Sequence, residues 1–477
     1  MFRDLLKRQI VEDILSFRFF LSFILIIVTV VIFAVIFIVH FRNAQLNYVS
    51  KVQENQQRLA EFSKSPQDGA AFTNQELWMK PRAEKFISFG SEDKIPQGLY
   101  FRMSPYELRL LNKKEDITGR GWYLPVSRRE SVTTSAFFSP DLASIIQFLL
   151  SFFAIALAFN AITGDKEEGS LRLVLSNPTK RTQLLMSKYV SALLTMCLPL
   201  LMSIIAGLVL LEMSGMISLP HEFILEVITF FLISLLYVST FILIGLLCSV
   251  LCQSSSKSLV LGLLFWIFLV FIFPKSMGLF LNLKRFEVPS PEQIERQADD
   301  LAAEIGDKYF KKEDLSLITD QNRRMEVILR GVQEEDEAKQ RLRDSYLQKK
   351  IASVVALRKI TIASPSSLFE YASSSLAGTG IFHFQHVLSQ AKLYADEFIL
   401  VVKQKAGAKQ ASSPFFFNFR AITDKSIDPS VLPNFEDKSV PFEERLKDAL
   451  PYLGLLVLYN LFLFAFVLLK FQSYDVR

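Results

Sequence analysis

Apolar side chains gather in six long runs along this chain, and polar segments of very different length separate them. A helix needs roughly 20 consecutive apolar residues to cross the hydrocarbon core of a membrane. The runs that reach this length lie at about 19–39, 142–162, 189–211, 223–250, 258–280 and 451–470. The pattern therefore predicts six transmembrane helices.

Two of the polar segments are long enough to fold outside a membrane. Residues 40–141 are interrupted by several prolines and predict a small insertion of mixed α/β structure. Residues 281–450 contain a dense alternation of acidic and basic side chains between about 291 and 362, which predicts a solvated helix or helical hairpin. The second insertion is therefore expected to be mainly helical.

The short connections carry the positive charge. Lys and Arg occur in residues 1–18, in 163–188, in the turn 251–257 and in the tail 471–477, whereas the loop Glu212–Glu222 has neither. An even number of spans puts all four basic segments on one side, and basic loops stay in the cytoplasm. We therefore expect a multi-pass protein of the cell (inner) membrane with cytoplasmic termini. The fold class is an all-α polytopic membrane protein with two large exoplasmic insertions.

Composition agrees with a membrane protein and excludes some functions. The chain has 477 residues, of which 51% are hydrophobic and 44 are Phe. A net charge of +5, spread along the chain, does not indicate a nucleic-acid partner. The three cysteines lie in or beside predicted spans, so the insertions have no disulfide framework.

One short polar segment, 163–188, has a distinctive pattern. Asp165 followed by Glu168 resembles a helix N-cap with its capping box. Leu171 and Leu175 then lie one turn apart on the same face. The pair Asn177–Pro178 is expected to end this helix and open the next one, with Asn177 as N-cap. The segment is either a lipid-surface helix or a docking element for another protein.

This segment also begins like a phosphate-binding loop, because Gly164 and Gly169 have the glycine spacing of a Walker A motif. Ser170 stands where the motif requires Lys, and Asp165 would place a carboxylate beside the phosphates. The segment is therefore not expected to bind a nucleotide.

The run from Asp141 to Tyr189 resembles the core of ABC-2-type permeases. Its closest resemblance is to the subgroup named for multi-copper enzyme maturation, the nitrous-oxide-reductase accessory permeases. The matching parts are the block Gly164–Leu171, the corner Leu175–Pro178 and the basic residues that follow. Asn160 departs from the pattern, since an Asp is expected there.

The resemblance implies the transmembrane subunit of an ABC transporter, with a second permease subunit and a cytoplasmic ATPase as partners in the lipid bilayer. ATP and magnesium would belong to the ATPase, so this chain would need no cofactor and would not itself be an enzyme. Residues 1–18 would form an amphipathic connecting helix, and 163–188 the coupling helix region. The residues implied in ATPase docking are Asp165, Lys166, Glu167, Glu168, Gly169, Leu171, Arg172, Leu175, Pro178 and Arg181.

Three function classes stay open. The first is a permease, most simply an exporter, and the second is a mechanotransmitter that moves its exoplasmic domains without translocating a substrate. The third, a membrane enzyme, rests only on the pair His383 and His386, a weak candidate for metal binding without a third ligand nearby. Glu226 becomes a functional candidate if it lies inside the bilayer. The substrate and an exoplasmic protein partner are not identified by the sequence.

Overall fold

The computed structural model describes residues 2–64, 74–90, 98–102, 107–111, 141–176, 180–215, 221–276, 289, 291–311, 319–405 and 428–473. Within these ranges six helical segments are long and apolar enough to cross a membrane. They are Phe17–Ala60, Leu142–Glu167, Arg181–Met213, His221–Leu251, Ser255–Ser276 and Phe442–Gln472. Each overlaps one of the six apolar runs, so the six-span prediction is confirmed.

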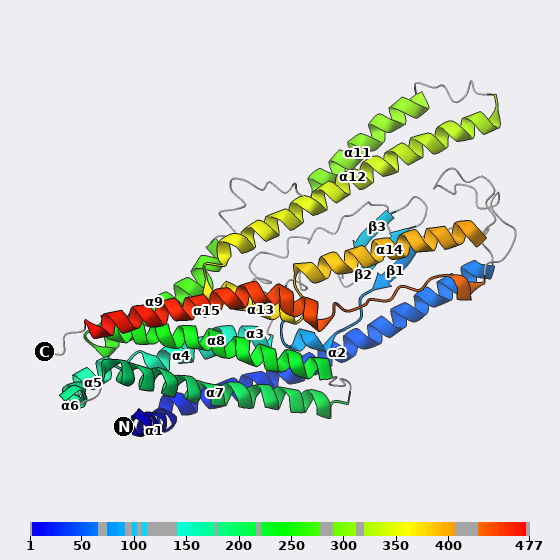
Figure 1. Ribbon diagram of the computed structural model, residues 1–477. Coiled ribbons are helices and arrows are strands. Elements are labelled where there is room, and N and C mark those ends of the chain that lie inside the picture. Colours follow the sequence, from blue (N-terminus) through cyan, green and yellow to red (C-terminus); the bar gives the residue numbers. More distant parts are fainter. Residues whose placement is uncertain are drawn as a thin grey trace.

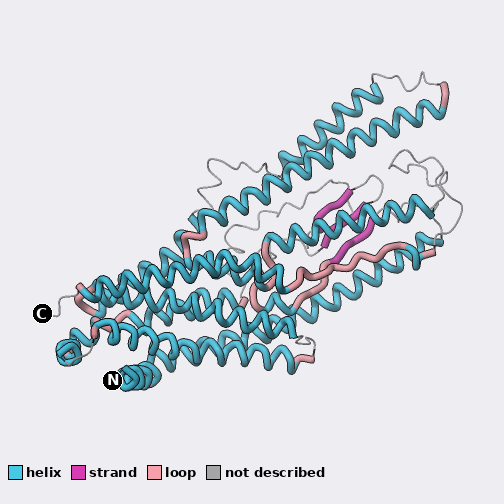
Figure 2. The backbone as a smooth tube through the Cα atoms, viewed as in Figure 1, coloured by secondary structure: helices cyan, strands magenta, loops and turns pink. Residues whose placement is uncertain are grey.

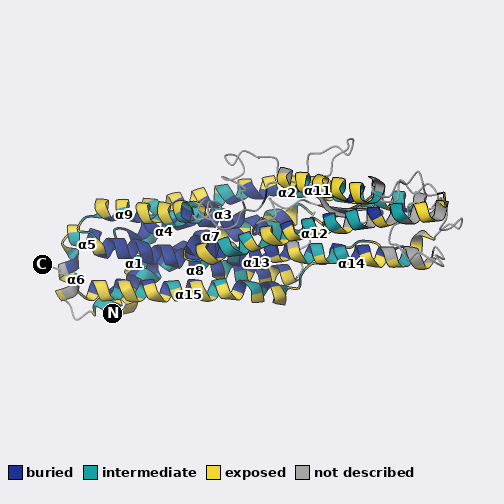
Figure 3. Ribbon diagram, turned by 90° about the horizontal axis from the view of Figure 1, so that it is seen from above, coloured by how far each residue is buried: buried dark blue, intermediate teal, exposed yellow. Residues whose placement is uncertain are grey.

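Four long helices form the frame of the bundle, namely α2 (Phe17–Lys64), α7 (Arg181–Met213), α8 (His221–Leu251) and α15 (Phe442–Gln472). Figures 1 and 2 show them side by side, with helices dominating the whole molecule. The α8 helix contacts both α7 and α15 and buries most of its side chains. Figure 3 shows the buried residues along the middle of the bundle and the exposed ones on its outside.

The second and fifth spans are each built from consecutive helical pieces. The second comprises α3 (Leu142–Ile145), a π-helical turn η4 (Ile146–Leu150) and α4 (Ser151–Ala158). The fifth comprises α9 (Ser255–Ile267) and a π-helical turn η5 (Phe268–Ile272). The two spans are joined by a hydrogen bond of 2.8 Å from Trp266 Nε1 to Ser151 Oγ.

Small and polar residues bring α8 close to its neighbours. A Cβ atom on Gly245 would lie 2.8 Å from the Cβ of Ala158, so this glycine allows α4 to pack directly on α8. Ser239 donates to Asn460 Oδ1 of α15 at 2.6 Å, and Asn460 Nδ2 donates to Thr240 Oγ1 at 2.9 Å. These residues therefore hold helices together.

At one end of the bundle lie both chain ends and three short helices (Figure 1). These are α1 (Phe2–Ile14), α5 (Thr163–Glu167) and α6 (Ser170–Ser176). The α7 helix begins at Arg181 with Lys180 as its N-cap. The prediction that Asn177 caps this helix is therefore wrong, and Asn177 and Pro178 lie outside the described residues.

The opposite end carries the parts that belong to the two predicted insertions. The α2 helix continues past its apolar run to Lys64, and a three-stranded antiparallel sheet follows in the order β1-β2-β3. The strands are β1 (Asn74–Trp78), β2 (Gly98–Arg102) and β3 (Glu107–Leu111), and the 3-10 turn η2 (Ala83–Phe86) lies between the first two. Phe86 of this turn stacks on Phe33 of α2, with ring centroids 5.2 Å apart.

The charged region, predicted as a solvated helix or a helical hairpin, consists of two helices that pack against each other. It consists of α11 (Pro291–Gly306), the π-helical turn η6 (Asp307–Lys311) and α12 (Gln321–Thr361), and it projects away from the bundle (Figure 1). After it come α13 (Pro365–Leu376), α14 (Ile381–Lys405) and the 3-10 turn η8 (Pro429–Val431).

The α13 helix lies inside the bundle, whereas the sequence placed it within the exoplasmic segment 281–450. It contacts α8 and α15, and the Phe369 ring stacks on Tyr237 of α8 at 4.4 Å. Ser364 caps its first turn and also donates to the carbonyl of Leu269 at 2.6 Å. A serine-rich run resembles a loop in sequence, but small hydroxyl side chains also permit close helix packing in an apolar surrounding.

Candidate functional site

Residues 164–188, here called the 164–188 block, fold as two short helices and the first turns of α7. Gly169 separates α5 from α6 with a φ of +74°, a conformation that favours glycine. The α5 helix begins at Thr163, and Ile162 occupies its N-cap position. The prediction that Asp165 caps a single helix is therefore wrong, because the chain turns at Gly169 instead of continuing.

Asp165 instead forms an ion pair inside the protein. Its Oδ2 lies 2.7 Å from Lys188 Nζ, and Lys188 is only 5% exposed. The same ammonium group lies 3.5 Å from Gln9 Oε1 of α1. This lysine thus connects α5, α7 and α1 at one point.

A second carboxylate, Asp13 of α1, lies beside this ion pair. It accepts a hydrogen bond of 2.5 Å from Ser191 Oγ of α7 and one of 3.4 Å from Gln9 Nε2. Burial raises the pKa of the Asp13 carboxyl, against the opposing effects of Ser191, Gln9 and the Lys188 charge. The amphipathic pattern of α1 is visible in the sequence, but nothing in that pattern indicates that Asp13 faces inward.

Glu167 links the block to the fifth span. Its carboxylate accepts hydrogen bonds from the backbone nitrogen of Ser255 at 2.8 Å and from Ser255 Oγ at 2.7 Å. Ser255 is the first residue of α9, so the carboxylate satisfies a free N–H group at the positive end of that helix.

Arg181 links the block to the sixth span. Its Nη1 donates to the carbonyl oxygens of Phe471 at 3.1 Å and of Gln472 at 2.8 Å, at the end of α15. The last carbonyls of a helix have no partner within it, and a cation near them is stabilising. Side chains of the block therefore bind α1, α9 and α15 as well as α7.

The apolar face of the block differs from the prediction. Leu171 is 1% exposed and belongs to the core of this chain, so it is not on an exposed docking face. Leu173 is 71% exposed instead. Glu168 and Gly169 are exposed and Lys166 is partly buried, whereas the side chains of Arg172 and Leu175 and all of Pro178 lie outside the description. The turn at Gly169 changes the orientation of α6 relative to α5. A prediction that assumed one continuous helix could therefore not tell which leucine side chains are buried.

Just before the block, Asn160 occupies the position where the sequence comparison expects Asp. Arg18 Nη1 donates to Asn160 Oδ1 at 2.9 Å, and the guanidinium carbon lies 4.6 Å from the centre of the Phe159 ring. The amide oxygen accepts the same hydrogen bond that a carboxylate would. Asn160 thus joins α2 to the second span without a negative charge.

Comparison with known proteins identifies the family. Residues 10–475 match the family model described as ABC-2 family transporter protein. The chain belongs to the ABC-2 family. A stretch of 61 residues is 41% identical to the probable ABC transporter permease protein NosY of Stutzerimonas stutzeri. That stretch covers 13% of this chain and 22% of NosY, so the similarity spans about a fifth of the relative.

Family membership confirms the resemblance found in the sequence and makes the protein a membrane-embedded transmembrane subunit of an ABC transporter. The partial match to NosY supports the subgroup to which the sequence pointed.

At the other end of this ABC-2 subunit, Glu226 of α8 is buried and paired. Its Oε1 contacts Arg445 Nη2 of α15, and Arg445 Nη1 donates to the carbonyl of Leu376 in α13 at 3.0 Å. Both side chains are less than a tenth exposed. Glu226 was identified from the sequence as a candidate. Arg445 was not, because its charged neighbours in the sequence are typical of the solvent-exposed first turn of a helix.

The two histidines have partners that do not suit a metal. Arg82 Nη1 lies 3.3 Å from His383 Nδ1, and Arg82 also pairs with Asp437 at 2.8 Å. Burial, reinforced by the charge of Arg82, lowers the pKa of His383 to about 2, so its ring is neutral. His386 lies 2.8 Å from the amide nitrogen of Gln390. In the described part of the chain no three His, Cys, Asp or Glu residues gather as metal ligands.

Proposed function

We propose that this subunit is an export permease in which the 164–188 block receives the motion of a cytoplasmic ATPase and passes it to the spans. The observation that carries the proposal is the set of polar contacts from the block to other helices. Asp165 contacts Lys188 of α7, Glu167 contacts α9, and Arg181 contacts α15. A displacement of the block would therefore act on several membrane helices at once.

The proposed orientation rests on the distribution of charge. Both chain ends and the block lie at the same end of the bundle (Figure 1), and the basic connections of the sequence belong to that end. Basic segments remain cytoplasmic in membrane proteins. This supports a cell-membrane protein with cytoplasmic termini, whose block faces the ATPase and whose α11–α12 hairpin faces the exoplasm. ATP and magnesium would bind to the ATPase, and a second permease subunit would complete the transporter.

Among the side chains of the block that the structure describes, Leu173 is the best placed for docking. It is an apolar side chain, 71% exposed, next to the exposed Glu168 and Gly169 at the turn between α5 and α6. Burying a leucine side chain against a partner contributes about 1.5–3 kcal/mol. Because about 1.4 kcal/mol corresponds to a tenfold change in affinity, losing this contact should be readily measurable.

The test is the Leu173→Asp variant, purified together with the ATPase. We expect association to weaken at least about tenfold and ATP hydrolysis by the complex to fall with it. Lys180→Asp is the control, because Lys180 is also exposed but lies outside the turn. Undiminished complex recovery and hydrolysis in Leu173→Asp would contradict docking at this turn.

Leu171→Asp serves as a second control with a different expected defect. Its side chain is 1% exposed within this chain, so an aspartate there would be a buried, unpaired charge. We expect low yield and a reduced unfolding temperature for the subunit alone. The two leucine variants thus separate loss of docking from loss of folding.

A further inference from the structure

The α1 helix lies across the end of the bundle that carries the 164–188 block. Figure 1 shows α1 end on, whereas α2 and α7 run along the plane of the view. The chain bends at Ser16, whose Oγ accepts a hydrogen bond of 3.2 Å from the backbone nitrogen of Phe19 in the first turn of α2. The apolar run of α2 begins at about residue 19, so α1 lies at the level where the hydrocarbon layer begins. Because its axis crosses those of the spans, α1 is roughly parallel to the membrane surface.

Contacts with α7 fix which side of α1 points inward. Lys188 Nζ lies 3.5 Å from Gln9 Oε1, and Ser191 Oγ donates to Asp13 Oδ2 at 2.5 Å. Gln9 and Asp13 are four positions apart and therefore lie on one side of the helix. The five other charged residues of α1 are exposed, namely Arg3, Asp4, Lys7, Arg8 and Glu12.

These exposed charges separate into two faces. One face, here called the basic stripe, follows the helical spacing i, i+4, i+7 and i+11 and consists of Arg3, Lys7, Ile10 and Ile14. The other face consists of Asp4, Arg8 and Glu12, each four positions from the next. The basic stripe therefore has two cations and no carboxylate.

The carboxylates of the other face have nearer cations of their own. Arg8 Nε lies 2.7 Å from Glu12 Oε1. The N-terminal ammonium group, and to a smaller extent Lys7, lower the pKa of the Asp4 carboxyl. The positive charge of the basic stripe is thus left largely uncompensated within α1.

The basic stripe continues into the exposed apolar surface of α2. Ile14 is 40% exposed, and exposed apolar side chains of α2 follow it at Phe17, Phe20 and Ile24. Because α2 is long and apolar enough to span the membrane, these side chains meet acyl chains. A row of cations that passes into a row of apolar residues is typical of a helix at the bilayer interface. There the apolar side chains enter the acyl boundary and the cations reach the headgroups.

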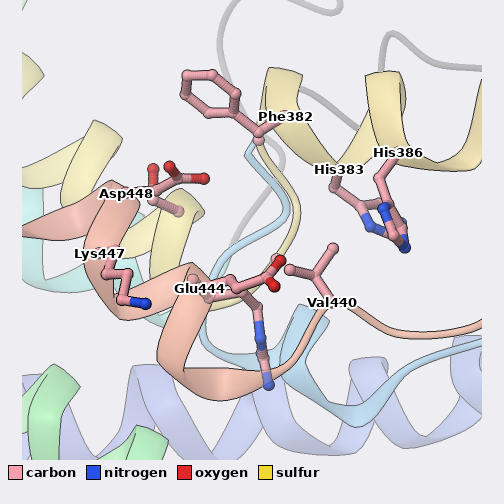
Figure 4. A pocket seen from close by; sticks show the side chains of 11 residues that line it. Phe382, His383, His386, Val440, Glu444, Lys447 and Asp448 are labelled. Carbon is pink, nitrogen blue, oxygen red and sulfur yellow. The ribbon is translucent and has the colours of Figure 1, made fainter. Parts of the chain in front are cut away.

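A cation at the opposite end of the bundle has a different setting. Lys447 borders a pocket of about 310 Å3 together with Glu444 and Asp448 (Figure 4). Two carboxylates there offset a single ammonium charge, so a negatively charged headgroup would gain little from it. The two cations of the basic stripe have no such carboxylates beside them on their face, and clustered basic residues are attracted to anionic lipids.

We propose that the basic stripe of α1 binds the headgroups of anionic phospholipids, which under the orientation proposed above belong to the cytoplasmic leaflet. Arg3 and Lys7 contact the phosphates, and Ile10 and Ile14 contact the adjoining acyl chains. The lipid surface thereby holds α1 against α7.

The same lipid contact restrains the 164–188 block. Lys188 contacts Gln9 of α1 and also pairs with Asp165 of α5 at 2.7 Å. When the lipid fixes α1, this lysine and its partner in α5 are fixed as well. Anionic lipid therefore stabilises α5 without contacting it.

The test is amide hydrogen exchange of the full-length subunit in nanodiscs of phosphatidylcholine, with or without an equal share of phosphatidylglycerol. A basic residue near an anionic membrane surface contributes about 1 kcal/mol, which corresponds to about fivefold in an equilibrium constant. We expect phosphatidylglycerol to slow exchange in α1 at least about tenfold, because two cations contribute, and Lys7→Gln to lose about fivefold of this protection. Exchange in α5 should slow in the same samples of the wild type.

Arg8→Gln is the matched control, because Arg8 follows Lys7 directly, is also exposed and loses the same charge, but lies on the other face. It should keep most of the protection by phosphatidylglycerol. Unfolding temperatures near that of the wild type establish that both variants fold. The ATPase is absent and both leaflets have the same composition, so neither docking at Leu173 nor the orientation of the chain affects the result.

Three outcomes would contradict the proposal. Equal exchange of α1 in the two lipid compositions, or equal losses of protection in Lys7→Gln and Arg8→Gln, would overturn binding at the basic stripe. Slowing confined to α1 would overturn the transmission to α5. Protection of α1 by added ATPase, with no effect of phosphatidylglycerol, would assign this face to a protein partner instead of a lipid surface.

Discussion

Two buried cations, Lys188 and Arg445, have matching roles at opposite ends of the bundle. Each is about 5% exposed, and each contacts a carboxylate from a different helix. Removing one partner of a buried pair leaves an uncompensated charge, whereas the intact pair contributes little net stability. Such pairs therefore fix which helices meet, and at each end they join elements that lie far apart in the sequence.

Asp13 is the residue whose ionisation should affect stability measurably. Folding raises the pKa of its carboxyl, so the folded protein binds this proton more tightly than the unfolded chain does. At neutral pH the buried negative charge of Asp13 therefore destabilises the fold. This destabilisation decreases as the pH falls through the raised pKa and the carboxylate becomes protonated. The nearby groups are Lys188, Glu12, Ser191 and Gln9.

We accordingly expect Asp13→Asn to raise the unfolding temperature at pH 7.5 by about 1–2 °C, which is roughly 1 kcal/mol for a chain of this size. The difference should shrink as the pH is lowered through the raised pKa, since both proteins are then neutral at this position. This difference in unfolding temperature is measured by thermal unfolding of the purified wild-type and variant subunits from pH 7.5 downward. Lower stability of the variant at pH 7.5 would mean that attraction to Lys188 outweighs burial.

At the scale of elements, the contact between α4 and α8 depends on a single missing side chain. A Cβ on Gly245 would lie 2.8 Å from Ala158 Cβ and 3.3 Å from the backbone oxygen of Ile155. The second of these atoms belongs to the backbone, so a rotamer change cannot relieve the overlap. The two helices would have to separate.

Gly245→Ala should therefore destabilise the subunit by about 1–3 kcal/mol, as overpacking does in other protein interiors. Gly454→Ala is its control in α15, because a Cβ there meets nothing within 4 Å and alanine favours helix formation. Unfolding temperatures of the two variants in the same detergent provide the measurement. Equal unfolding temperatures would show that the bundle adapts freely at α8.

The elements also show which features the sequence could predict. The long apolar runs and the helical structure of the charged region were predicted correctly, because each has a periodicity or composition that persists over many residues. The inward position of Leu171 was not predicted, because it depends on the φ of Gly169 and on packing against distant helices. The buried α13 was not predicted for a similar reason, since a segment with five serines does not look apolar in sequence, and its burial depends on packing against α8 and α15.

For the whole molecule, the arrangement of its two ends makes the proposed topology testable. In a variant without Cys197, Cys248 and Cys252, single cysteines can replace the exposed residues Lys180 and Ser345, which precede α7 and lie in α12. We expect a membrane-impermeant thiol reagent to label intact cells at position 345 and not at position 180. Permeabilised cells should be labelled at both positions, and labelling of intact cells only at position 180 would reverse the topology.

The length of α2 has a mechanical consequence. Its 48 residues run without a break from the end that holds α1 to the region where it touches β1 and η8. At 1.5 Å per residue the helix is about 72 Å long, more than twice the thickness of a hydrocarbon core of about 30 Å. A tilt of only about 5° around its first turn would move its far end by roughly 6 Å. A rearrangement too small to separate the membrane helices is thus amplified into a displacement as large as a side chain at the opposite end of the protein.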